Sequence, residues 1–142
     1  MANLKIMSLN GQDMVELITK DSAMPTQDSS AYWRGQCLTA MIKEVDPDVI
    51  GLVEAPPYQE RTETFTKERL DDDYNVYQAE KRGLLGMAFL IRKSLNLNVQ
   101  MRSKTESLKD FKLDQFDADG DGIKEHYSWF NRVPFEVVLE GN

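Results

Sequence analysis

The stretch that most constrains the fold is residues 46–54, Asp-Pro-Asp-Val-Ile-Gly-Leu-Val-Glu. Residues 49–53 are apolar except for one glycine, and an unbroken apolar run predicts a strand buried on both faces. Prolines follow at positions 56 and 57, so the strand ends near Glu54. Because ligands of open α/β sheets bind at the carboxyl ends of strands, Glu54 is a candidate functional residue. A solvated carboxylate at a strand end is the simpler alternative.

A first strand with a polar residue at its end is predicted near the N-terminus. Residues 4–9 alternate sufficiently between apolar and polar side chains, and the Asn10-Gly11 pair breaks the pattern. Asn10 therefore also lies at a strand end, although Asn-Gly most often marks a turn.

A helix is predicted over residues 31–45, with Ser29 or Ser30 as its N-cap. The apolar side chains that recur at helical spacing, and that we expect to face the sheet, are Cys37, Leu38, Met41, Ile42 and Val45. Cys37 is then a small core residue and not a nucleophile. Strand, helix and strand in this order predict a βαβ unit with two parallel strands.

The remaining pattern predicts a helix over residues 58–70, whose charge run is interpreted as a solvated face, followed by several strands. The strands are predicted over residues 74–79, 84–92, 95–101, 126–130 and 133–139, and residues 105–116 form a short strand or an irregular edge. Residues 74–92 read as an antiparallel hairpin. The expected fold class is α/β (α+β), a mixed and mostly antiparallel sheet with two helices on one face.

Composition and charge exclude some classes of function. The chain has 142 residues, enough for one domain over residues 1–142, and no apolar run long enough to span a membrane. Its net charge of −7 argues against broad electrostatic adhesion to nucleic acid. A single cysteine precludes an intrachain disulfide. The cellular location stays open: the protein is either cytoplasmic, or secreted with its signal peptide absent from this sequence.

An aspartate-rich loop at residues 117–125 is the sharpest local motif. Carboxylates at alternate positions followed by glycine resemble the first half of a Ca²⁺ loop. The ligands that this pattern predicts are Asp117, Asp119, Asp121, the carbonyl of Ile123 and Glu125. Ser128 stands where an EF-hand has its closing Glu, and no entering helix precedes the loop, so an EF-hand is not predicted. A short acidic turn between strands is the alternative.

His126 is the only histidine in the chain. Without a second His or a Cys beside it, a zinc site is not expected. No motif supports a Ser-His-Asp apparatus either, so we interpret His126 as structural.

Four segments in order resemble the endonuclease/exonuclease/phosphatase (DNase I-like) superfamily. Residues 4–10 resemble its opening strand, which ends in Asn, and residues 47–54 resemble its second motif, which ends in Glu. Residues 83–88 and 132–139 resemble the hairpin and the strand pair that follow. The resemblance covers nearly this whole chain but only the N-terminal half of the family domain.

The resemblance implies a metal-dependent phosphoester hydrolase, with Asn10 and Glu54 as catalytic ligands of Mg²⁺ or Mn²⁺. The later Asp-x-Asn and Asp-His motifs of the family have no counterpart here, so the chain is expected to be incomplete for catalysis alone. Two positions depart from the family pattern: Leu9 replaces an aromatic residue, and Gln12 stands where nucleases often have Asp or Asn. The class of phosphate-ester substrate stays open.

The resemblance also implies half of a four-layer αββα sandwich. One apolar face of the sheet would then be uncovered, and we expect a homodimer or a missing C-terminal half to bury it. The alternative function is a non-catalytic, Ca²⁺-binding module that retains half of the scaffold and forms dimers.

Overall fold

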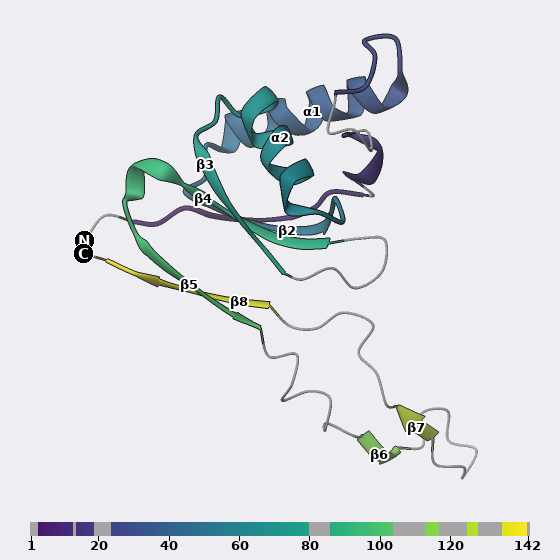
Figure 1. The fold of residues 1–142 in the computed structure, drawn as a ribbon, viewed down its shortest axis with the longest axis vertical. Helices are drawn as coiled ribbons and strands as arrows, with labels where there is room; N and C mark the ends of the chain where they lie inside the picture. The colour runs from purple at the N-terminus through teal and green to yellow at the C-terminus, as the bar shows by residue number, and fades with distance from the viewer. Residues whose placement is uncertain are drawn as a thin grey trace. The chain divides into compact units, whose positions relative to one another are not determined.

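The computed structural model describes residues 3–12, 14–18, 24–79, 86–103, 113–116, 125–127 and 135–141. The chain forms two compact units. The first comprises Met1–Asn98 with Leu139–Asn142, and the second comprises Val99–Val138. Helices and strands are both present (Figure 1), which confirms the predicted α/β class.

The first unit is built on a four-stranded mixed sheet in the order β1-β2-β4-β3. The strands are β1 (Ile6–Asn10), β2 (Val49–Ala55), β3 (Tyr74–Gln78) and β4 (Gly86–Arg92). β1 pairs with β2 in parallel, which confirms the βαβ unit, and β4 is antiparallel to both of its neighbours. β2 is therefore paired on both edges. Its sequence predicted burial on both faces, and the face that carries Gly51 and Val53 is only half-buried.

Two helices, α1 (Ser30–Val45) and α2 (Gln59–Arg69), cover one face of this sheet (Figure 1). Ser29 is the N-cap of α1, and its hydroxyl accepts a hydrogen bond from the backbone N–H of Tyr32 at 3.1 Å. The helix ends at Asp46, which has a left-handed φ of 49° and donates its N–H to the carbonyl of Ile42 at 2.8 Å. Two short 3-10 helices, η1 (Met14–Glu16) and η2 (Lys93–Leu95), complete the first unit.

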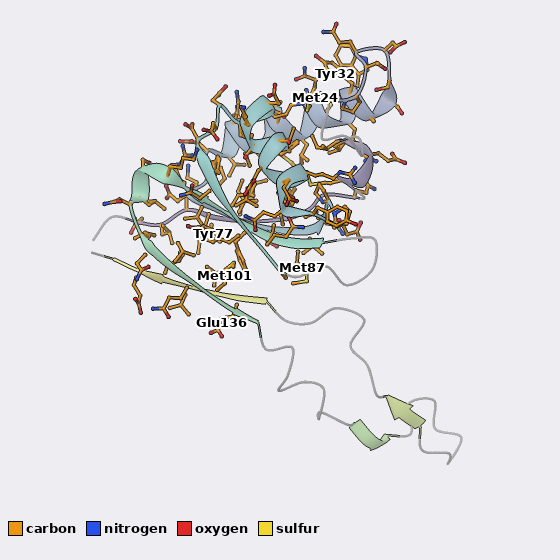
Figure 2. The ribbon with its side chains drawn as sticks, in the orientation of Figure 1. Met24, Tyr32, Tyr77, Met87, Met101 and Glu136 are labelled. Atoms are coloured by element: carbon orange, nitrogen blue, oxygen red, sulfur yellow. The ribbon has the colours of Figure 1, made fainter. Side chains whose placement is uncertain are left out.

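The core lies between the helices and the sheet. Its largest buried side chains include Ile50, Leu90, Ile42, Phe65 and Met14. Register places Ile50 beside Leu90, so alternate residues of these strands face the helices. On the opposite face of the sheet lie Tyr77 and Met87 (Figure 2).

The buried face of α1 differs from the predicted one. Cys37 is exposed, and Met41 and Val45 expose 42% and 37% of their surface, so the expectation that they face the sheet is wrong. The buried positions include Gly35 and Thr39. Two other residues of the predicted face do point inward: Ile42 is 2% exposed, and Leu38 is partly buried against the core.

Most of the charge run of α2 is solvated, as predicted, since Glu60, Glu63, Lys67 and Glu68 are exposed. The buried face, however, is largely polar and includes two arginines. Arg61 and Arg69 each expose only 7% of their surface, and Thr62 is fully buried. The Thr62 hydroxyl donates to Oε1 of Gln78 at 2.6 Å, and Nε2 of Gln78 donates to the carbonyl of Pro56 at 2.7 Å. This chain of bonds satisfies buried polar groups and ties α2 and β3 to the segment that follows β2.

Arg92 links several segments at the end of the sheet where β2 begins. Its Nη2 donates to a carboxylate oxygen of Asp46 and, at 2.9 Å, to the carbonyl of Pro47. The guanidinium also lies 5.1 Å from the ring centre of Tyr74, whose hydroxyl donates to Pro47 at 2.7 Å. These contacts hold the turn before β2 against β3 and β4.

The remaining strands form two pairs, which lie wholly or mostly in the second unit. β5 (Asn98–Ser103) and β8 (Phe135–Glu140) form a two-stranded sheet, and β6 (Leu113–Phe116) pairs antiparallel with β7 (Glu125–Tyr127). β5 begins later than predicted because η2 occupies residues 93–95. Among the described residues, no helix has the length and hydrophobicity needed to span a membrane.

Gly86 provides a test of the packing beneath the end of β2. A Cβ at this position would stand 2.6 Å from the carbonyl oxygen of Pro56 and 2.7 Å from Nε2 of Gln78. We expect Gly86→Ala to lower the free energy of unfolding by about 2 kcal/mol, since the backbone of Pro56 cannot move aside cheaply. In Gly51→Ala the nearest atom is 3.5 Å away, so this control should be neutral or stabilising by about 0.5 kcal/mol. Urea denaturation measures both, and equal effects would contradict the packing argument.

The burial of Tyr74 predicts that the free energy of unfolding falls at alkaline pH. Burial raises the pKa of its hydroxyl above the ordinary 10.0, and the charge of Arg92 opposes this only in part. The unfolded chain therefore loses this proton first, so the contribution of Tyr74 is complete below about pH 10 and falls as pH rises through the folded-state pKa. Denaturation midpoints from pH 8 to 11 should fall more steeply for the wild type than for Tyr74→Phe. An equal slope would refute this, and Tyr58→Phe, at an exposed position, is the control.

Candidate functional site

The two candidate residues of the first unit meet at one edge of the sheet. Because β1 and β2 are parallel, their carboxyl ends lie together, and Asn10 pairs in register with Val53. Nδ2 of Asn10 donates to Oε1 of Glu54 at 3.4 Å, although 44 residues separate them in sequence. The structure thus brings together the two strand-end residues that the sequence singled out.

A β-bulge directs Glu54 towards Asn10. The register of β2 against β4 shifts between Val53 and Ala55, and Glu54 is the extra residue, with a left-handed φ of 62°. The carbonyl of Val53 accepts the N–H of Gly11 at 2.8 Å, which joins the two strand ends beside the bulge. A non-glycine residue in this conformation costs of order 1–3 kcal/mol, and such outliers concentrate at functional sites.

The orientation of Asn10 is defined by its second hydrogen bond. Oδ1 accepts the backbone N–H of Gln12 at 2.8 Å, so the amide nitrogen must face Glu54. Gln12 also has a left-handed φ, of 51°. In this arrangement Asn10 orients the carboxylate of Glu54, while its own oxygen is engaged by the turn. The sequence offered no signal for this role of Gln12.

The donor set fits a magnesium ion held mostly by water and substrate. Mg²⁺ commonly binds one or two carboxylates, keeps several waters, and takes its remaining ligands from phosphate groups. Glu54 is half-buried and Asn10 is exposed, so one carboxylate stands at an accessible edge. In the described ranges no cluster of three or more His, Cys, Asp or Glu residues could hold a metal. Magnesium binding at this edge stays a prediction.

The predicted Ca²⁺ loop lies mostly beyond the residues that the structure describes. Asp117, Asp119, Asp121 and Ile123 fall in residues 117–124, and Glu125 begins β7, where its backbone pairs with Phe116. The described elements on either side are strands, so the surroundings are not those of an EF-hand. Calcium binding here stays a prediction.

Among the described residues, hollows of about 370, 190 and 280 Å³ are lined mainly by α1, α2, β3 and the loops beside them. Neither Asn10 nor Glu54 lines any of them. The candidate edge is therefore separate from these hollows.

No protein-family model, curated protein or solved structure matches this chain. The likeness to the endonuclease/exonuclease/phosphatase superfamily, the four-layer sandwich and the magnesium assignment thus remain predictions. They rest on the residues of this chain and their geometry.

The conformation of Glu54 predicts a conflict between stability and function. Glu54→Gly should raise the free energy of unfolding by about 1 kcal/mol, because glycine adopts a positive φ without steric cost. Glu54→Gln keeps the Cβ and therefore the steric strain, so its free energy of unfolding should stay that of the wild type. Urea denaturation of the two variants, at equal ionic strength and without divalent ions, compares them directly. If the glutamine variant is as stable as the glycine variant, Glu54 is not strained.

Proposed function

We propose that this chain carries the metal-binding half of a Mg²⁺-dependent phosphoester hydrolase, with Glu54 as the ligand and Asn10 as the residue that orients it. The observation that supports this is the contact of Asn10 with a strained Glu54 at the carboxyl edge of a parallel strand pair. The parallel βαβ unit, which brings the two strand ends together, also supports the proposal.

Each residue has a defined task in this proposal. Glu54 presents one carboxylate oxygen to the ion, while Asn10 donates to Oε1 and restricts how the carboxylate can turn. The N–H of Gln12 holds the amide of Asn10 in that orientation. The ion, when bound, would polarise a phosphoryl oxygen and stabilise a leaving oxyanion. A general base is still required, and the sequence motifs predict none in this chain.

Metal binding is therefore the first property to measure, with Mn²⁺ as a paramagnetic probe in competition with Mg²⁺. We expect Glu54→Gln to weaken binding by more than tenfold, since the only charged ligand is lost. Asn10→Ala should weaken it by about tenfold, because the carboxylate loses the group that orients it. Glu44→Gln, at an exposed position of α1, is the matched control and should bind as the wild type does.

Hydrolysis of bis(p-nitrophenyl) phosphate and p-nitrophenyl phosphate by the same variants separates metal binding from chemistry. Binding that depends on Glu54, with or without turnover, supports the proposal. Equal Mn²⁺ affinity in the wild type and Glu54→Gln would overturn it, as would phosphodiesterase activity that survives this substitution.

A further inference from the structure

A hollow of about 280 Å³ lies between α1 and the end of α2, and Asn10 is not among its lining residues. Its lining residues, which define the Arg69 hollow, are Met24, Tyr32, Gln36, Thr39, Lys43, Glu68, Arg69 and Asp71. Figure 2 shows Met24 and Tyr32 together near the N-terminal end of α1. One of the lining residues, Arg69, carries a positive charge on a nearly buried side chain.

Arg69 is a buried cation without a carboxylate partner among the described residues. Only 7% of its surface is exposed. Nη2 donates to the carbonyl of Tyr32 at 3.5 Å, the outer limit of a hydrogen bond, and Nε has no partner in the described part of the chain. Burying a charge is costly unless it is paired, and a guanidinium offers five donors.

The remaining compensation is a cation–π contact. The guanidinium carbon lies 4.6 Å from the centre of the Tyr32 ring, which attracts a cation but carries no net charge to neutralise it. By contrast Arg92, which is less buried, has carboxylate oxygens of both Asp46 and Asp48 nearby. The more buried of these two arginines therefore has the poorer charge balance.

The charged neighbours of Arg69 do not neutralise it. Lys43 pairs with Asp71 at 2.6 Å, so these two side chains cancel one another. Glu68 lines the hollow but makes no ion pair with Arg69 within 4.0 Å. Its negative charge stands near the opening and would weaken, not replace, the binding of an external anion.

The space that the Arg69 guanidinium occupies is shaped by residues of α1. A Cβ on Gly35 would lie 3.2 Å from Nη2 of Arg69, so glycine in the middle of α1 makes room for the charged group. Glycine in a helix interior is destabilising relative to alanine, so this space is made at a cost to the helix. The ring of Tyr32 is fixed in turn, because Nε2 of Gln36 donates to its hydroxyl at 2.8 Å.

We propose that the Arg69 hollow binds a small oxyanion, the phosphate or carboxylate group of a ligand, with the Arg69 guanidinium as its main contact. A planar guanidinium recognises both groups through paired hydrogen bonds. The hollow is near the lower end of the size range of ligand sites, which suits a compact ligand. The site is independent of the proposed hydrolase activity.

The experiment is a titration of the full chain with inorganic phosphate and, separately, with acetate, against chloride at constant ionic strength. Thermal stability and the ¹⁵N-labelled arginine Nε–H resonances report binding, since a ligand specific for the native state raises stability by mass action. We expect millimolar phosphate or acetate to raise the melting temperature and to shift one arginine resonance. The anion that binds more tightly shows whether the hollow prefers a phosphate or a carboxylate group.

Three variants locate the site. Arg69→Lys should lose about tenfold in affinity, because the paired hydrogen bonds are lost. Glu68→Gln, at an exposed position, should bind several-fold more tightly because a repulsive charge is removed, and it keeps the test valid if Arg69→Lys does not fold. Glu63→Gln makes the same change of charge as Glu68→Gln, at an exposed residue of the same helix that lines a different hollow, and it should bind as the wild type does.

Two results would overturn the proposal. One is a wild type that responds to phosphate and acetate no more than to chloride. The other is a pair of variants, at positions 68 and 69, that bind as the wild type does.

Discussion

The pairing of β2 on both edges is the constraint on which the rest of the first unit depends. β1 lies parallel on one side and β4 antiparallel on the other, so every backbone group in the middle of β2 has a partner within the sheet. The parallel side brings the carboxyl ends of β1 and β2 together. The antiparallel side introduces the bulge that turns Glu54 out of the regular alternation. A site at this edge therefore follows from the topology.

Polar groups inside the first unit are held by specific partners. Thr62, Gln78 and Pro56 form a hydrogen-bonded chain under the end of β2, and Gly86 leaves room for it. Half-satisfied buried networks are costly, so a chain of this kind specifies one arrangement of α2 against β3. The segment that follows Glu54 is anchored by the same contacts.

The surface ion pairs contribute much less. Lys43 with Asp71 and Lys93 with Asp72 are exposed, and exposed pairs are typically worth less than about 1 kcal/mol. Residues 71–73 are three consecutive aspartates. Two of them, Asp71 and Asp72, pair with different lysines and do not converge on one cation. Buried arginines are the more informative charges here, because their burial must be compensated locally.

Local sequence pattern by itself determined most of the elements. The apolar run at 49–53, the Ser29 cap and the prolines after Glu54 act over a few residues, and the corresponding strand and helices lie where they were predicted. Placement of Asn10 and Glu54 at strand ends followed from the same local signals, and their meeting at one edge followed from the βαβ rule.

The tertiary structure alone decided which helix faces are buried and how the side chains are oriented. Cys37 is exposed and Arg69 buried because Gly35 lets a guanidinium lie against α1, which depends on a residue of another helix. Likewise, the amide nitrogen of Asn10 faces Glu54 because Gln12 engages its oxygen. Such outcomes depend on distances between segments far apart in the sequence, and periodicity within one segment carries no information about them.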